Sequence, residues 1–222
     1  MLEYADLPTL GAYLSLTYAD ATESPQHKAK WARDAVYFAG CKMVLDLGCG
    51  PGHFLGVMRK QGTAAYGVDT EPASYAACRR QGLAARKMDC LTHLRGLKVG
   101  SLPGLHCSNL LEHLPMAQAL ELLALAASRL APGGRLVLST ANPACLGIMT
   151  HSFWDDPQHV RPWPASLLQR LAEGHGLSVE FAGPDELTRP QGPVRQMIRA
   201  LRTALIGPYF EAPEVLLLAR KP

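Results

Sequence analysis

The chain has 222 residues, of which 48% are hydrophobic and 18% are charged, and its formal charge is +3. This much apolar surface excludes a disordered chain, and so small a charge argues against a nucleic-acid-binding domain, which concentrates basic residues on one face. No stretch approaches the ~20 apolar residues that span a bilayer. The first residues also lack the basic leader of a secretory signal, so we expect a cytoplasmic protein without a transmembrane segment.

Six cysteines are spread along the chain. They form no C-x-x-C pair, and no group of Cys and His has the spacing of a zinc site. Most lie in or beside apolar runs, where a free thiol behaves as a small hydrophobic group. We therefore expect free thiols and no structural metal.

Short apolar runs alternate with helical stretches through the middle of the chain. Strands are expected at residues 42–48, 63–69, 83–89, 104–111 and 134–140, and helices at 53–61, 71–81 and 115–130. The turn Pro132-Gly133-Gly134 introduces the fifth strand. Such alternation is typical of βαβ units, a parallel sheet and helices on both faces.

Further elements flank this region. Ser24 and Pro25 are typical of a helix N-cap followed by proline at the first position, and that helix would end at Gly40. After the fifth strand, a helix is expected at 165–174, a strand at 177–183, a helix at 194–205 and a strand at 214–220. No linker or internal repeat divides the chain, so we expect one domain.

A glycine-rich loop follows the first expected strand. Gly48, Gly50 and Gly52 stand where that strand turns into its helix, and a helix N-terminus offers free N–H groups to a polar ligand. A dinucleotide-binding oxidoreductase needs G-x-G-x-x-G, but its third glycine would fall on His53. The spacing here is G-x-G-x-G, preceded by Asp46. This arrangement resembles motif I of the class I S-adenosylmethionine (SAM)-dependent methyltransferases.

Four later segments resemble further motifs of the same family, in its order. They are Asp69 at the end of the second strand, Met88-Asp89-Cys90 after the third, Ser108–Pro115 after the fourth, and Leu130–Leu136 before the fifth. Together with the glycine loop they cover roughly residues 40–140. The resemblance implies SAM as the cofactor.

The resemblance also implies an α/β, Rossmann-like, doubly wound sheet of seven strands. Its order would be 3-2-1-4-5-7-6, with the last strand antiparallel and helices on both faces. Within the single domain 1–222 we expect an N-terminal helical cap (1–40), a cofactor-binding core (41–140), an acceptor loop (141–164) and the C-terminal part of the sheet (165–222).

The family's binding mode assigns the cofactor's contacts. By resemblance, Asp46 and the glycine-loop backbone would meet its methionine part, Asp69 its ribose and Asp89 its adenine. The full expected set is Asp46, Gly48, Cys49, Gly50, Gly52, Asp69, Met88, Asp89, Cys90, Asn109 and Leu110.

His113, just past the fourth strand, is the first candidate for a catalytic base, because imidazole titrates near neutrality. His159 is the second candidate. The alternative is that Glu112 and His113 cap the helix that starts near Pro115. Some relatives bind magnesium around this motif, but Asn109 and its neighbour supply no further acid, so we expect no metal.

The segment 152–164 is dense in aromatic and charged residues, which is more than a solvated linker requires. It resembles the D-P-x-H-x-R-P segment of bacterial methyltransferases of surface-polysaccharide and lipopolysaccharide assembly. Rings and charged groups together suit a sugar. The expected substrate-binding residues are Trp154, Asp155, Asp156, His159 and Arg161. The alternative is a self-packed lid in which Trp154 and Trp163 are buried and Arg161 pairs with a neighbouring aspartate.

The helix expected at 194–205 carries apolar residues on one face and Arg195, Arg199 and Arg202 on another. It is either solvated surface or a contact for an anionic acceptor or a membrane surface. The sequence thus predicts a SAM-dependent methyltransferase of an oxygen on a saccharide or another hydroxyl-bearing metabolite. The alternatives are a methyltransferase of another small molecule, including an amine, or of RNA, and a silent cofactor-binding subunit. The sequence indicates no oligomeric state.

Overall fold

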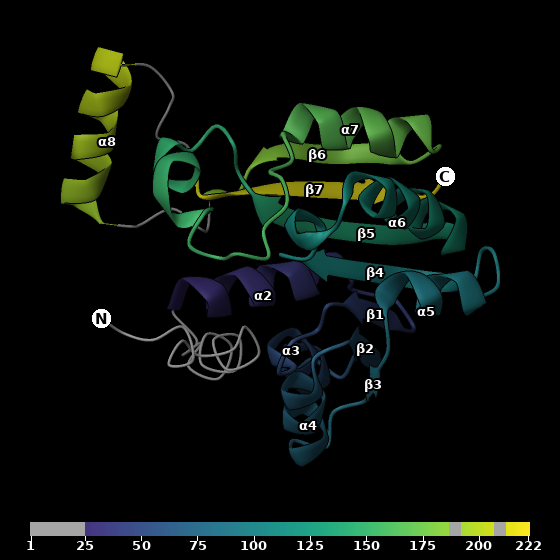
Figure 1. Cartoon of the computed structure of the whole chain (residues 1–222). Coiled ribbons are helices and arrows are strands. Elements are labelled where there is room, and N and C mark those ends of the chain that lie inside the picture. The colour runs from purple at the N-terminus through teal and green to yellow at the C-terminus, as the bar shows by residue number, and fades with distance from the viewer. Residues whose placement is uncertain (1–24, 187–191, 207–211) are drawn as a thin grey trace, which may run out of the picture.

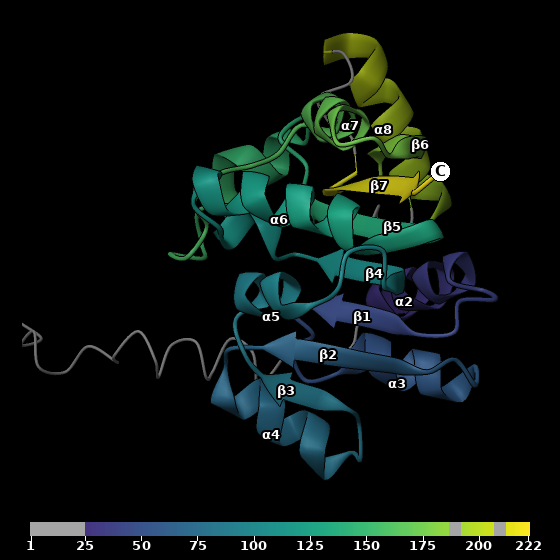
Figure 2. The same cartoon turned by 90° about the vertical axis from the view of Figure 1, so that its right-hand side faces the viewer.

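A seven-stranded sheet forms the centre of the computed structural model, which describes residues 25–186, 192–206 and 212–222 (Figures 1 and 2). Its strands are β1 (Val44–Leu47), β2 (Ala65–Asp69), β3 (Ala85–Lys87), β4 (Leu102–Ser108), β5 (Leu130–Ala141), β6 (Ser178–Pro184) and β7 (Glu214–Arg220). Their order is β3-β2-β1-β4-β5-β7-β6. Strands β1 to β5 pair in parallel, and β7 runs antiparallel to β5 and β6. The expected fold class is confirmed.

The helices connect these strands. They are α2 (Pro25–Tyr37), α3 (His53–Lys60), α4 (Pro72–Arg80), α5 (Cys90–Gly96), α6 (Met116–Arg129), α7 (Ala165–Gly174) and α8 (Pro193–Ile206), with the short turns η2 (Leu111–His113) and η3 (Ile148–Ser152). No helix in the described ranges is long and apolar enough to cross a membrane. Ser24, the expected cap of α2, lies outside the described residues.

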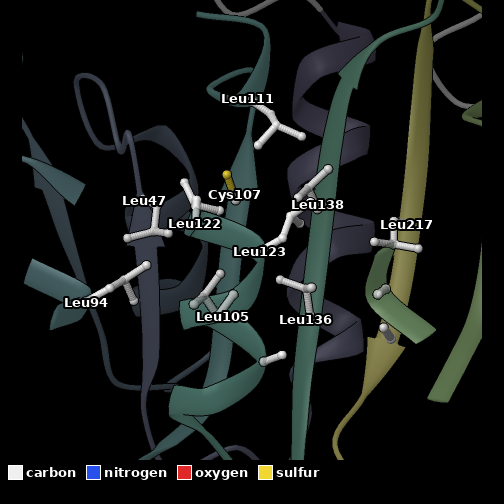
Figure 3. Packing of buried hydrophobic residues seen from close by; sticks show 14 of the residues in the cluster. Leu47, Leu94, Leu105, Cys107, Leu111, Leu122, Leu123, Leu136, Leu138 and Leu217 are labelled. Carbon is white, nitrogen blue, oxygen red and sulfur yellow. The ribbon is translucent and has the colours of Figure 1, made fainter. Parts of the chain in front are cut away.

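Two hydrophobic clusters cover the two faces of the sheet. Leu216 and Leu218 of β7 join the cluster under α2 and α3, whereas Leu217, between them, joins the cluster under α5, α6 and α7. This alternation follows from the period-two geometry of a strand. Figure 3 shows leucines of β1, β4, β5 and α6 meeting in the larger cluster. A parallel sheet covered on both faces leaves its strand ends as the place for a polar ligand.

Helix α5 is an element that the sequence analysis missed. Asp89 caps it, since its Oδ1 accepts the N–H of Thr92 at 2.8 Å. Leu91 and Leu94, one turn apart, are its buried contacts. A helix this short shows too little periodicity for the pattern to stand out, although an aspartate before an apolar pair was a usable signal.

The expected turn at Pro132-Gly133-Gly134 lies inside β5, which begins earlier than predicted. Leu130 already pairs with Leu102, and the register shifts before Gly104. A Cβ on Gly134 would stand 2.8 Å from two backbone oxygens, so only glycine fits this irregularity. The pairing jumps from Leu130 to Arg135, and Gly133 has a φ of 75°, so the predicted turn is present as an excursion within β5 rather than before it.

Candidate active site

A cavity of about 330 Å³ opens at the carboxyl ends of β1, β2 and β4. Its lining residues are Gly48, Gly50, Val68, Asp69, Thr70, Glu71, Ser74, Met88, Asp89, Cys90, Asn109, Leu110, His113, Leu114 and Gln158. Ligands of open α/β sheets bind at such strand ends. Most of the residues expected around the cofactor therefore lie on one cavity.

The glycine loop and the end of β2 are joined by hydrogen bonds. The N–H of Gly50 donates to Asp69 Oδ2 and that of Glu71 donates to Oδ1, both at 2.8 Å. Burial raises the pKa of Asp69, although these two N–H groups favour its ionised form. A carboxylate held in this way has a fixed direction toward the cavity that it lines.

Gly52 has a packing role rather than a place on the cavity wall. It precedes α3 with φ at 90°, and a Cβ there would stand 2.6 Å from Leu83 and 2.8 Å from the Cys78 sulfur. It is not among the residues that line the cavities described here. The glycine therefore lets α3 start close against neighbouring residues behind the loop.

Asn109 is in a backbone conformation that few residues adopt. Its φ is 52°, in the left-handed region that asparagine tolerates better than most other side chains. Its N–H donates to the Ser139 carbonyl at 2.9 Å. Such local strain is typical of functional sites, and here it turns the chain at the end of β4 toward the cavity.

A second cavity, of about 220 Å³, adjoins the first and shares Gly48, Gly50 and Asn109 with it. Asp46 and Cys49 line this second cavity and not the first. The rest of its lining comes from α2, the glycine loop, the start of α3 and β4: His27, Lys30, Trp31, Pro51, His53, Phe54, His106 and Ser108. A ligand longer than one cavity can therefore extend from β3 toward α2.

A buried histidine that the sequence analysis missed holds Asp46. His106 Nδ1 lies 2.7 Å from Asp46 Oδ1, and its Nε2 lies 3.3 Å from Asp34 Oδ2 of α2. Burial alone would lower the pKa of His106, but the carboxylates of Asp46 and Asp34 outweigh burial and raise it to about 9. His106 therefore carries a proton at neutral pH, and its positive charge offsets the negative charge of the Asp46 carboxylate.

The same network fixes α2 to the sheet. Lys30 donates to Ser108 Oγ at 2.9 Å and pairs with Glu214 of β7. Arg33 pairs with Asp34 and Asp185. Buried charges are tolerated only when they are paired in this way. The sequence did hold a signal, since polar and apolar residues alternate along β4. The polar ones point to the face that α2 covers.

His113 lies in η2 and lines the first cavity, where its ring centre is 4.6 Å from that of His159. Burial and the nearby His159 lower the pKa of His113 below its usual 6.5. Helix α6 has Pro115 as its N-cap residue and no side-chain cap hydrogen bond. The alternative that Glu112 and His113 cap this helix is therefore wrong.

His159 reaches this position through the expected acceptor loop. Its Nδ1 donates to the Phe153 carbonyl at 2.7 Å, and its ring stacks on that of Phe153, which is buried. The N–H groups of Val160 and Arg161 both donate to the Glu112 carbonyl. The loop is thus bonded directly to η2, which brings the two candidate catalytic histidines together.

Glu112 lies fully buried beside the two histidines. Its Oε2 accepts the hydroxyl of Thr140 at 2.7 Å, and burial raises its pKa. Ligand atoms of Glu112, His113 and His159 lie within 4.8 Å of one another, so these groups could hold a divalent cation. The expectation of no metal considered only the acids next to Asn109, and sequence spacing could not reveal the approach of His159.

The remaining acceptor-loop residues are divided between surface and core. Trp154 is 62% exposed and its Nε1 donates to the Met149 carbonyl, whereas Trp163 is buried. The guanidinium of Arg161 lies 4.6 Å from the centre of the Trp163 ring. The self-packed lid is therefore correct for Trp163 and wrong for Trp154.

The expected aspartates of the loop lie outside the wall of the first cavity. Asp155 lies 3.2 Å from His151 Nδ1, and Asp156 accepts the N–H of Gln158. Trp154 and Arg161 are also absent from that wall, whereas Gln158, which the sequence analysis missed, belongs to it. Of the loop residues, Gln158 therefore lies on the cavity wall, whereas His159 is not on that wall and reaches the candidate site only through its contact with His113.

Comparison with known proteins agrees with this arrangement. The sequence profile of a family described as "Methyltransferase domain" matches residues 27–180. A ubiquinone biosynthesis O-methyltransferase of Xanthomonas oryzae pv. oryzae (strain PXO99A) is 29% identical over 134 residues, which are 56% of this chain and 55% of that protein. The chain thus spans about half the length of the curated relatives that it matches.

Solved structures share the fold over nearly the whole chain. A SAM-dependent methyltransferase from Archaeoglobus fulgidus has a TM-score of 0.76 and 27% identity, with 94% of this chain and 98% of that chain covered. The magnesium protoporphyrin IX methyltransferase of Synechocystis PCC 6803 with bound SAM has a TM-score of 0.59 and 16% identity, with 89% and 80% covered. Because the family profile covers most of the sequence, the chain belongs to the methyltransferase-domain family, in its SAM-dependent class.

Proposed function

We propose that the chain transfers the methyl group of SAM to a hydroxyl oxygen of a saccharide or another hydroxyl-bearing metabolite. The observation that carries the proposal is the position of His113, which lines the first cavity and lies beside His159. The six cysteines are free thiols, which is compatible with the reducing cytoplasm that we propose as its location.

The lining of the first cavity supports the binding of an adenosine there. Asp69 would accept hydrogen bonds from the ribose hydroxyls, and Met88 and Asp89, which follow β3, would lie beside the adenine ring. A Cβ on Gly50 would meet nothing within 4 Å, so the loop leaves open space there. The second cavity would take the methionine end, beside Asp46. When bound, SAM would supply a methyl group activated by its sulfonium sulfur, and S-adenosylhomocysteine, a neutral thioether, would be the leaving group.

The chain would mainly position the acceptor and remove its proton. A lowered pKa keeps the His113 imidazole neutral near pH 7, so one of its ring nitrogens is available to accept the hydroxyl proton. The Nδ1–H of His159 donates to the Phe153 carbonyl. Its Nε2 is therefore left to accept a hydrogen bond from a second hydroxyl of the substrate. Positioning of this kind accounts for much of the rate of a bimolecular transfer.

Two oxygen acceptors have separate support. The exposed ring of Trp154, beside Asp155, suits the apolar face and hydroxyls of a sugar. The second candidate is an oxygen acceptor of ubiquinone biosynthesis, because that is the activity in the names of the curated relatives. Another small molecule, an amine or RNA remains an alternative acceptor.

The test is transfer of radiolabelled methyl groups from SAM to a panel of saccharides and phenols. Replacing His113 with Ala should lower kcat by roughly 10²- to 10⁴-fold, as for removal of a general base, and leave the Kd for SAM unchanged. The matched control is His175→Ala, because His175 is exposed at the end of α7. Full turnover by the His113 variant would refute the assigned role. SAM binding without transfer to any acceptor would favour the silent subunit.

A further inference from the structure

Helix α8 exposes a continuous apolar stripe. Its five members are Val194, Met197, Ile198, Leu201 and Leu205, which are between 40% and 73% exposed. Their spacing places them on one face of a helix. Figures 1 and 2 show α8 standing off from the sheet on the side of β6 and β7. Large apolar side chains gathered on one face in this way mark a surface that binds a partner.

The charges of the same segment have one sign. Arg195, Arg199 and Arg202 occupy helical positions along one flank of the stripe, and residues 187–210 include no Asp or Glu. The side chains of Arg195 and Arg199 lie outside what the structure describes, so their placement rests on helical position alone. The face opposite the stripe has Gln196 and Thr203, both exposed. An apolar stripe bordered by arginines is complementary to a surface that is apolar inside and anionic at its edge.

We propose that α8 binds the surface of an anionic lipid bilayer, with its stripe in the acyl boundary and its arginines at the phosphates. A helix of this composition lies in the plane of the interface. Its 14 residues extend about 21 Å, less than the ~30 Å hydrocarbon core, so it lies on the membrane rather than crossing it. A second copy fits less well, because an antiparallel isologous contact through the stripe would place both sets of arginines on the same side.

The attachment of α8 to the sheet gives this contact a direction. Glu214, which begins β7 shortly after α8, pairs with Ala141, which ends β5. The acceptor loop leaves β5 at that same end of the sheet. Membrane binding through α8 would therefore hold the loop end of the molecule near the lipid surface. The inference does not depend on methyl transfer, since it concerns a different surface.

The test is co-sedimentation of the whole chain with vesicles of phosphatidylcholine, with and without phosphatidylglycerol. Binding is expected only with phosphatidylglycerol and should weaken as salt is added. Replacing all three arginines with Gln should lower partitioning on the order of 100-fold, at about fivefold for each charge.

A matched pair of variants separates the stripe from total charge. Met197→Asp/Leu201→Asp should abolish binding, whereas Gln196→Asp/Thr203→Asp adds the same charge on the face opposite the stripe and should retain most of it. Calorimetry with SAM should give the same Kd for both, which shows that they fold.

Three results would overturn the proposal. The first is failure of the unmodified chain to bind phosphatidylglycerol vesicles, and the second is equal binding by the two variant pairs. The third is a concentration-dependent dimer in sedimentation velocity that the stripe variant dissociates, because this would assign the face to a second copy.

Discussion

His106 should make the stability of this protein depend on pH in a way that one substitution removes. It is buried between Asp34 and Asp46, and its pKa is about 9 in the folded chain against 6.5 in an unfolded one. The difference corresponds to about 3 kcal/mol, at ~1.4 kcal/mol for each pKa unit. Because the folded pKa is raised, this contribution is complete below pH 6.5 and is lost as the pH rises through about 9.

The perturbation is His106→Gln, which can still hydrogen-bond but carries no charge. Urea unfolding followed by tryptophan fluorescence would give the free energy of unfolding at steps from about pH 6 to about pH 9.5. The unmodified chain should lose about 3 kcal/mol more than the variant over this range. The control is His175→Gln, at an exposed histidine, which should follow the unmodified chain.

The variant will also be less stable at pH 7, by roughly 3–5 kcal/mol, because two buried carboxylates lose their counter-charge. Should it fail to fold, Asp34→Asn provides the same test. Removing one carboxylate lowers the pKa of His106, so the fall in stability should begin at lower pH. Equal pH dependence in all these proteins would refute a protonated His106.

Further predictions concern the glycine loop, the base and the metal. Gly52→Ala should destabilise the fold by about 2 kcal/mol, because its Cβ would clash and its φ is positive. Gly56→Ala, inside α3 where a Cβ meets nothing within 4 Å, should stabilise the fold by about 0.5–1 kcal/mol. Chemical unfolding of both variants would measure the two changes in the free energy of unfolding. The acid limb of the kcat/KM profile should lie below pH 6.5, because the pKa of His113 is lowered, and a limb above 7 would contradict this base. EDTA should leave turnover unchanged, since the Thr140 hydroxyl already donates to Glu112 Oε2 and the proposed transfer uses no metal. Loss of activity that Mg²⁺ or Mn²⁺ restores would instead identify a metal site at Glu112 and its two histidines.

The apolar runs between helices predicted a parallel sheet, because β1, β4, β5 and β7 are mostly buried, and the family resemblance supplied the order of the strands. The same reasoning located Asp69 and His113, since the ends of parallel strands meet at one edge of a sheet. It could not place His159 beside His113, because hydrogen bonds between distant segments set that contact.

The sequence held a signal for the polar side of β4, but it did not indicate the partners of His106. His106 lies within an apolar run, and its partners come from α2 and β1, so only the packed structure brings these groups together. The turn at Pro132-Gly133-Gly134 was a correct local signal, but the pairing of Leu130 with Leu102 makes β5 begin before that turn. Local patterns thus predicted the elements, whereas the contacts between elements determined the chemistry of the site.

Calorimetric titration with SAM and with S-adenosylhomocysteine is the most direct test of the cofactor site. The unmodified chain should bind each ligand at one site, and Asp69→Ala should weaken binding by roughly 10- to 100-fold, as for loss of hydrogen bonds to a charged group. The control is Glu173→Ala, at an exposed residue of α7, which should bind normally. Absence of heat with both ligands, or normal binding by the Asp69 variant, would contradict the assignment of the cavity between β1, β2 and β4 to this cofactor.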